Sequence, residues 1–240
     1  MDKAVERWWS PRLYQDLTLA RWGHYGTPLL LFPTAGGDAE EVERMGLLDS
    51  IGHLVEAGAV KVYSVDSLAG RALARREGDP AHRMWLFNAF HRAVEHEVVP
   101  AVHMDCGGPV DLVTAGASIG AFNAVAMVAR FPRHFRAALG MSGTYDLQAF
   151  LGESNDDLYY ASPLQFLPGL HGEDLDVLRS RFLLLAAGTG RWEDIGESWR
   201  LANVLGEKGI PNRVDDWGPH RDHDWPTWRE MLPTYLPQLL

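Results

Sequence analysis

Five short, almost uninterrupted apolar runs alternate with segments of helical periodicity, and this alternation restricts the fold more than any other feature. Strands that are buried on both faces of a sheet produce such runs, because neither face meets water. Strands that alternate with helices form a mostly parallel sheet with helices on both faces. We therefore predict an α/β fold with strands at 28–33, 60–65, 110–115, 135–142 and 181–187, and a further strand at 211–217.

The predicted helices fill the intervals between these strands, and one of them is apolar almost throughout. That helix, residues 119–131, must be deeply packed, whereas the other helical patterns carry a polar face. Gly209 suits the position just after a helix end. The helical patterns lie at 39–58, 80–102, 119–131 and 197–209. The aromatic-, Pro- and Gly-rich segment 147–180 predicts a small cap or wall over a site and is too short for an independent lid domain.

The N-terminal segment has a different pattern, since residues 14–23 alternate polar and apolar side chains. Such alternation is typical of a half-exposed strand, and Ser10-Pro11 before it indicates a turn. We expect an antiparallel edge hairpin here. A length of 240 residues suits one large domain, so residues 1–240 are predicted to form a single domain.

Charge and cysteine content restrict the partners and the compartment. The formal net charge of −10 argues against a nucleic-acid partner, and the basic cluster Arg71, Arg75 and Arg76 is expected on a solvated helix face. Cys106 is the only cysteine and is expected to be a surface thiol. We see neither a secretory signal nor an apolar run of about 18 residues, so a cytoplasmic protein without a membrane partner is expected.

A serine between two glycines stands where an apolar strand meets the apolar helix, in Gly116-Ala117-Ser118-Ile119-Gly120. A sharp strand-to-helix turn would expose the Ser118 hydroxyl at the carboxyl end of the strand, where α/β sheets collect functional groups. The flanking residues must be small, and the helix N-terminus favours a developing oxyanion. We interpret Ser118 as a nucleophile, with a structural turn serine as the alternative.

A nucleophilic serine needs a general base, and the loop in 215–228 offers two histidines, His223 and His220. We favour His223. The histidines in the predicted helices, at 53, 91 and 96, are expected on polar helix faces. A metal site built from His220, Asp222, His223 and Asp224 is disfavoured, because adjacent loop residues seldom face one ion, so we expect neither a metal nor a cofactor.

The acid that orients the histidine should follow the strand at 181–187, where Glu193 and Asp194 both stand. Glu193 is favoured, Asp194 is the alternative acid, and Asp146 is a third candidate. The chain order serine, acid, histidine is that of α/β-hydrolases. The oxyanion donors would be the N–H of Ile119 and that of Ala35 or Gly36, in the loop 34–38.

These motifs together resemble the esterase family of α/β-hydrolases that includes esterase D-like enzymes, feruloyl esterases, enterochelin esterases and mycolyltransferases. The likeness is carried by WWSPRL, LLFPTAGG, AGASIGAFNA, MSGTYD, GTGRWED and a C-terminal HDWP. The likeness is strongest to small bacterial members of this family. The resemblance implies an α/β-hydrolase fold and supports His223 over His220, and it leaves Glu193 and Asp194 open.

We therefore predict a serine carboxylic-ester hydrolase that acts on a small-molecule ester through Ser118, Glu193 and His223. An acyltransferase that uses the same acyl-enzyme is an alternative, and so is a non-catalytic binding protein with this fold. Tryptophans could also form a self-association surface that makes the protein a homo-oligomer; those considered are Trp8, Trp9, Trp225 and Trp228.

Overall fold

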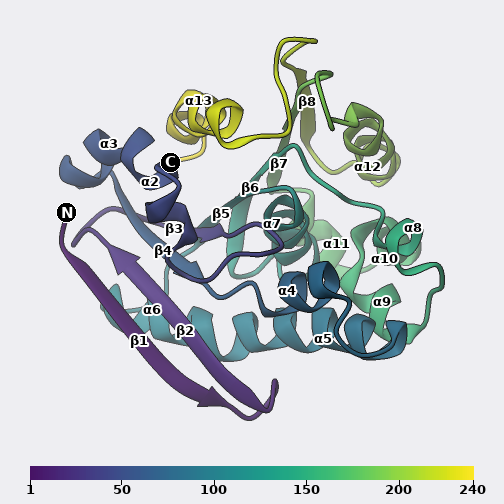
Figure 1. Cartoon of the computed structure of the whole chain (residues 1–240), viewed down its shortest axis with the longest axis horizontal. Helices are drawn as coiled ribbons and strands as arrows, with labels where there is room; N and C mark the ends of the chain where they lie inside the picture. The colour runs from purple at the N-terminus through teal and green to yellow at the C-terminus, as the bar shows by residue number, and fades with distance from the viewer.

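One eight-stranded sheet forms the centre of the computed structural model, which describes residues 1–240 (Figure 1). Its strands are β1 (Lys3–Ser10), β2 (Gln15–Trp22), β3 (Thr27–Phe32), β4 (Val60–Val65), β5 (Leu112–Ala117), β6 (Phe135–Met141), β7 (Phe182–Ala187) and β8 (Asn212–Asp216). They lie side by side in the order β1-β2-β4-β3-β5-β6-β7-β8. Strands β3 to β8 pair in parallel, and β1 and β2 form an antiparallel hairpin at one edge. The predicted α/β sheet with an N-terminal hairpin is confirmed.

Successive residues of the parallel strands enter two separate hydrophobic clusters, one on each face of the sheet. In β3, Leu30 and Phe32 belong to the larger cluster, whereas Leu29 and Leu31 belong to the smaller one. This alternation follows from the two-residue period of a strand. Both faces are covered, so the strands read as continuous apolar runs in the sequence.

The helices divide between these two faces. Buried side chains of α4 to α12 join the larger cluster, and those of α1 to α3 and α13 join the smaller one. The helices are α1 (Glu41–Arg44), α2 (Leu47–Ser50), α3 (Gly52–Glu56), α4 (Leu68–Arg75), α5 (Pro80–Ala93), α6 (Val99–Asp105), α7 (Ile119–Arg130), α8 (Leu147–Leu151), α9 (Asp156–Ala161), α10 (Pro163–Phe166), α11 (Glu173–Leu178), α12 (Ile195–Glu207) and α13 (Trp225–Tyr235). A π-helix (Val94–Val98) and 3₁₀ turns at Leu167–Gly169 and Leu236–Gln238 complete the set.

Helix α7 has the deep position that its sequence predicts, since every residue from Ile119 to Ala129 is buried. Gly209 follows the end of α12 with φ of 69°, as expected for a residue that ends a helix. The segment 39–58 differs from the expected continuous helical pattern, because it forms the three short helices α1, α2 and α3. Gly46 separates α1 from α2 with a φ of 71°, which a helix cannot contain.

The predicted helix at 80–102 continues through a π turn into α6, and Pro100 is the second residue of α6. Proline has no N–H to donate within a helix, so one backbone carbonyl in the preceding turn loses its partner. The wider π turn lies next to this break in the hydrogen-bond pattern. The segment 147–180 forms α8 to α11 and one 3₁₀ turn, and its buried apolar side chains belong to the larger cluster. Only Phe150 of this segment lines the cavity described below.

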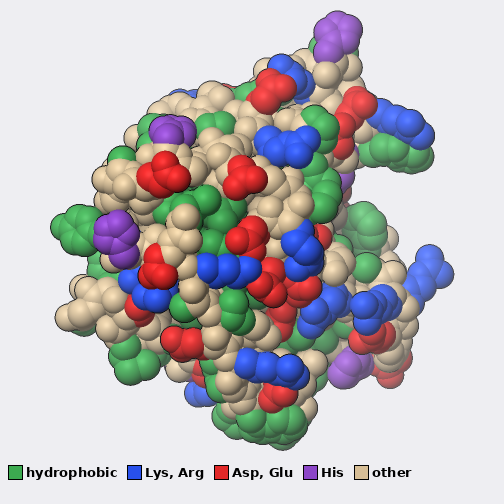
Figure 2. Space-filling view, turned by 60° about the vertical axis from the view of Figure 1, so that its left-hand side comes forward, with side chains coloured by type: hydrophobic (Ala, Val, Ile, Leu, Met, Phe, Trp, Pro, Cys, Tyr) green, Lys and Arg blue, Asp and Glu red, His purple; other side chains and the backbone are tan.

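Acidic and basic side chains are interspersed on the face of the molecule drawn in Figure 2, and no continuous basic field covers that face. Most arginines pair with carboxylates, for example Arg181 with Asp111 at 3.2 Å. None of the helices is both long and apolar enough to cross a membrane.

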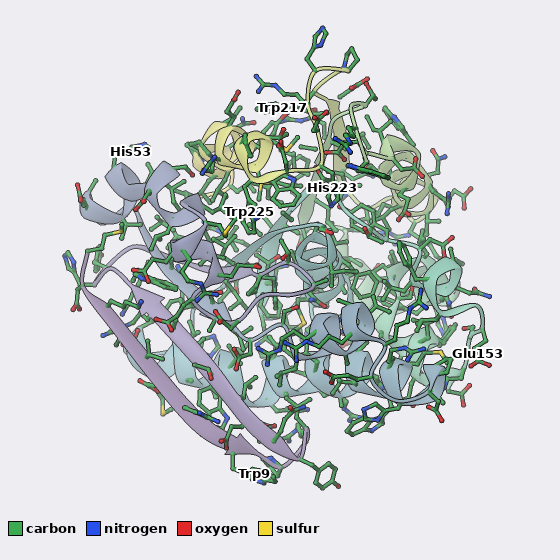
Figure 3. The ribbon with its side chains drawn as sticks, viewed as in Figure 1. Trp9, His53, Glu153, Trp217, His223 and Trp225 are labelled. Carbon is green, nitrogen blue, oxygen red and sulfur yellow. The ribbon has the colours of Figure 1, made fainter.

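The four tryptophans proposed for self-association do not form one surface. Trp9 lies on the edge strand β1 and is 60% exposed, far from Trp225 at the start of α13 (Figure 3). Trp228 is buried, and its ring packs edge-on against Trp225 with centroids 5.0 Å apart. The expectation of a shared tryptophan surface is therefore wrong.

His91 also departs from expectation, because it is fully buried between α5 and α7 rather than on a polar helix face. Its Nε2 lies 3.0 Å from Oδ1 of Asn123, and its ring stacks on Phe122. Burial, reinforced by the charge of Arg130, lowers the pKa of His91 to about 3. The core therefore holds a neutral imidazole, because the charged form would have to give up its hydration.

This buried histidine should make the protein lose stability as the pH falls below about 6.5. The unfolded state takes up a proton at that pH, whereas the folded state does so only near pH 3. Between pH 7 and 5 the free energy of unfolding should fall by about 2 kcal/mol more in the wild type than in His91→Gln. Urea unfolding at both pH values checks this, with the exposed His53→Gln as the control. Equal pH dependence in the wild type and His91→Gln would contradict the assignment.

Candidate active site

Ser118 stands at the turn from β5 into α7, and its backbone occupies a region that non-glycine residues rarely adopt. Its φ is 58° and its ψ is −122°. The N–H of Ser118 donates to the carbonyl of Met141 at 3.0 Å, and its own carbonyl accepts from Ala121 and Phe122. The turn lies where the strand order reverses, since β4 is on one side of β3 and β5 is on the other. Open α/β sheets bind ligands in the crevice at such a reversal.

Gly116 and Gly120 make this turn sterically feasible. A Cβ on Gly116 would lie less than 3.0 Å from backbone atoms of Gly120. A Cβ on Gly120 would lie less than 3.0 Å from the carbonyl oxygens of Phe32 and Pro33. Helix α7 thus approaches the ends of β3 and β5 at a distance that excludes any side chain. The requirement for small flanking residues, predicted from the sequence, is confirmed.

Two loops hold an acid and a histidine together at the same edge of the sheet. The N–H of Arg191 donates to Oδ1 of Asp222 at 2.7 Å, and the N–H of His223 donates to the carbonyl of Arg191 at 3.0 Å. Glu193 Oε2 lies 3.7 Å from Nδ1 of His223, and the Glu193 side chain is only 1% exposed. This separation is within ion-pair range and is longer than a hydrogen bond.

The second carboxylate oxygen of Glu193 has a partner of its own. Ser142, which follows β6, donates its hydroxyl to Glu193 Oε1. Trp228 donates its indole N–H to the Ser142 Oγ at 2.9 Å. The Trp228 ring also packs edge-on against His223, with centroids 5.1 Å apart. Trp228 and Ser142 therefore hold the orientation of a buried carboxylate that would be costly to leave unpartnered.

The alternative acids and base lie elsewhere. Asp194 caps α12, where its side chain accepts from the N–H of Gly196 at 2.9 Å. Asp146 caps α8 and pairs with Arg200 at 2.7 Å. His220 is exposed and has no ion-pair partner. The structure places Glu193 beside His223, and it does not bring Asp194, Asp146 or His220 into this pair.

The carboxylates considered for a metal site are used in other ways. Asp222 accepts from the backbone of Arg191, and Asp224 accepts from the N–H of Thr227 as the cap of α13. No group of three or more His, Cys, Asp or Glu side chains is arranged to hold a metal ion.

The loop after β3 has two unpaired backbone donors beside Ser118. Residues Thr34 to Gly37 form a turn closed by the Gly37 N–H, which donates to the Thr34 carbonyl at 3.1 Å. Neither the N–H of Ala35 nor that of Gly36 donates to a protein atom. Glu41 fixes the loop by accepting from the N–H of Thr34 at 2.8 Å. Ile119 is the first residue of α7, where an N–H has no partner within the helix.

One cavity of about 640 Å³ joins these groups. Ser118, Ile119, His223 and Ala35 all line it, whereas Gly36 does not. The other lining residues are Leu73, Ala74, Arg76, Arg83, Thr144, Phe150 and Trp192. Figure 3 shows His223 at the upper edge of the sheet, beneath the loop that carries Trp217.

Backbone strain is concentrated around this cavity. Five non-glycine residues have a positive φ, and four of them line the cavity or contact Glu193. These four are Arg76, Ser118, Ser142 and Trp192. Strained conformations persist only where the surrounding structure enforces them, and they gather at functional sites.

Sequence reasoning did not identify Ser142, Trp228 and Asp222 as part of the site. Ser142 lies in the MSG segment after β6, and Trp228 lies one turn into the helix after HDWP. Each follows a strand whose carboxyl end faces the site, which is the signal that could have found them. Their contacts join loops that come from distant parts of the chain, so they exist only in the folded structure.

The glycine contacts predict that Gly120→Ala is strongly destabilising. The added methyl group meets backbone carbonyls that cannot move aside, so the free energy of unfolding should fall by about 3 kcal/mol. Urea or thermal unfolding measures this. Gly206→Ala is the matched control, because no atom lies within 4 Å of its added Cβ and a helix gains stability from the same change. Equal stability of Gly120→Ala and wild type would contradict the packing argument.

Comparison with known proteins supports this fold. No protein-family model matches the sequence, and no curated protein matches it. Solved structures match nearly the whole chain. A ferulic acid esterase matches with a TM-score of 0.76 and 15% identity over 99% of this chain and 96% of that one. An S-formylglutathione hydrolase from Agrobacterium tumefaciens matches with a TM-score of 0.68 and 12% identity over 98% and 93%.

The enterobactin esterase FES from Shigella flexneri matches with a TM-score of 0.67 and 21% identity over 99% of this chain and 60% of that one. The chain therefore has the α/β-hydrolase fold, and the structures that it matches include esterases of that fold. A fold hosts many activities, so the activity has to be argued from the site itself.

Proposed function

We propose that this protein is a serine hydrolase of carboxylic esters that works through an acyl-enzyme. The observation that carries the proposal is the strained turn that presents Ser118 to the cavity lined by His223, with the buried Glu193 behind the imidazole. A binding protein would have no need for this combination of strain and buried charge.

In the proposed reaction, the Ser118 Oγ attacks the ester carbonyl carbon while His223 Nε2 takes the hydroxyl proton. The tetrahedral intermediate collapses, the C–O bond to the alcohol breaks, and His223 returns the proton to the departing alcohol. Water then attacks the acyl carbon while His223 takes its proton. The bond between the acyl carbon and Ser118 Oγ breaks, His223 returns the proton to Oγ, and the carboxylic acid leaves. Glu193 holds the imidazole in place and stabilises its protonated form.

The oxyanion formed in both steps would accept hydrogen bonds from the N–H of Ile119 and from the loop after β3. Ala35 is the favoured donor of that loop, because it lines the cavity and Gly36 does not. Its N–H has no protein partner to give up when the oxyanion forms. Such preorganised donors are worth roughly 10²–10³ in kcat each.

Substitution of the proposed triad should abolish turnover and separate the two candidate acids. Ser118→Ala and His223→Ala should lower kcat by roughly 10⁴–10⁶ on an activated short-chain ester. Glu193→Gln should cost at least about 10³, because the imidazole loses its charged partner. Asp194→Asn is the matched control, since Asp194 caps a helix and does not face His223.

Labelling with a fluorophosphonate, read as intact-protein mass, tests the nucleophile without any assumption about the substrate. Wild type should gain one adduct, and Ser118→Ala and His223→Ala should gain none. A folded wild type that gains no adduct would overturn the proposal and favour a non-catalytic binding protein. A larger loss in Asp194→Asn than in Glu193→Gln would overturn the assignment of the acid.

Ser142 should act as a positioning residue for Glu193. Ser142→Ala removes the donor to Glu193 Oε1 and the acceptor for Trp228, so kcat should fall by about tenfold or more while KM changes little. Ser142→Cys keeps a donor without a β-branch, which the positive φ of residue 142 would disfavour, and should recover part of the rate. Ester kinetics and circular dichroism of both variants check this. A folded Ser142→Ala variant with wild-type kcat would contradict the role of the hydroxyl.

A further inference from the structure

The cavity that holds Ser118 and His223 also holds two arginines and no carboxylate. Arg76 and Arg83 are its only ionisable side chains apart from His223. The chain as a whole is acidic, with 32 Asp and Glu against 22 Lys and Arg. A positively charged cavity in an acidic protein attracts anions to one place on the molecule.

Arg76 presents a guanidinium with no protein partner. It ends α4 in the left-handed region, with φ of 55° and ψ of 39°, and this bends the chain away from the helix axis. Nearby acids are engaged elsewhere, because Glu77 pairs with Arg75 at 3.5 Å and Asp79 caps α5. Arg76 is exposed at the end of α4, as expected for the basic cluster, and it also lines the cavity.

One guanidinium nitrogen of Arg83 hydrogen-bonds to the protein, and the other two side-chain nitrogens have no protein partner. Its Nη1 donates to the carbonyl oxygens of Gly78 at 2.6 Å and Glu77 at 3.4 Å. Its Nε is buried and has no surface that a ligand could reach, whereas no hydrogen bond to the protein involves its Nη2. The Nη2 N–H groups can therefore donate to an oxygen of a carboxylate or phosphate.

We propose that the cavity takes esters that carry an anionic group, a carboxylate or a phosphate, and that Arg76 and Arg83 hold this group. The inference rests on the proposed function, because the ester carbon must reach Ser118 while the anion meets the arginines. Leu73 and Phe150 line the same cavity and would contact the apolar chain between the two ends. An ester with a charge at one end would thus be bound along its whole length.

A matched pair of esters tests the preference for charge. Mono-p-nitrophenyl adipate carries a free carboxylate, and methyl p-nitrophenyl adipate has the same leaving group and chain without the charge. Wild-type kcat/KM should be at least about tenfold higher for the charged ester. The ratio should fall as NaCl is raised, because salt screens partly exposed charges.

Arginine variants then assign the preference to this cavity. Arg76→Gln should lower the charged-to-neutral ratio about tenfold, and the double variant with Arg83→Gln should lower it further. Arg75→Gln is the matched control, because it removes the same charge from the neighbouring residue, which is 68% exposed and outside the cavity. It should keep the wild-type ratio. An equal loss on both esters in Arg76→Gln would indicate a structural role and overturn the inference.

Binding to Ser118→Ala distinguishes failure of this inference from failure of the proposed function. In calorimetry, monomethyl adipate or phenyl phosphate should bind to this variant, and neutral dimethyl adipate should not. The double variant Ser118→Ala with Arg76→Gln should lose the binding of the anion. Tighter binding of phenyl phosphate than of monomethyl adipate would identify phosphate as the anionic group. Anion binding without any ester hydrolysis would keep the anion site and overturn the proposed function. Hydrolysis of both esters at equal rates would overturn the anion site and keep the proposed function.

Discussion

The close approach of α7 to the ends of β3 and β5 is the contact on which the rest of the site depends. Gly116 and Gly120 allow backbone to pack against backbone, and this brings the N-terminus of α7 into the crevice where the strand order reverses. Ser118 is exposed to the cavity only because this packing enforces its strained φ and ψ. A side chain at Gly116 or Gly120 would separate the helix from the sheet and remove the turn.

A second layer of contacts joins loops that come from distant parts of the chain. The loop after β7 carries Glu193, the loop after β8 carries His223, and backbone hydrogen bonds hold the two loops together. Ser142 then donates to the buried carboxylate from the far side, and Trp228 donates in turn to the Ser142 hydroxyl oxygen. The acid and the histidine are therefore fixed by polar contacts, whereas the sheet beneath them is held by apolar packing.

The low sequence identity to proteins of the same fold is consistent with this difference between the apolar sheet and the polar contacts above it. The matched esterases share 12–21% of their residues with this chain. A parallel sheet requires only apolar runs and a few close-packed glycines, which many sequences satisfy. The lining of the cavity, with Arg76 and Arg83 facing an otherwise neutral wall, is free to differ from one such protein to another.

The sequence by itself determined the sheet, the edge hairpin, the buried helix α7 and the position of Ser118, because strand and helix periodicity and the small residues around a sharp turn are visible in the local sequence. It also narrowed the candidate acid to Glu193, Asp194 or Asp146 and the candidate base to two histidines. Only the tertiary structure decided which of these side chains meet, since Glu193 and Asp194 are adjacent in the chain and only the fold shows that one faces His223 while the other caps α12. The burial of His91, the contacts of Ser142 and the place of Arg76 in the cavity were likewise decided by packing between segments far apart in the chain.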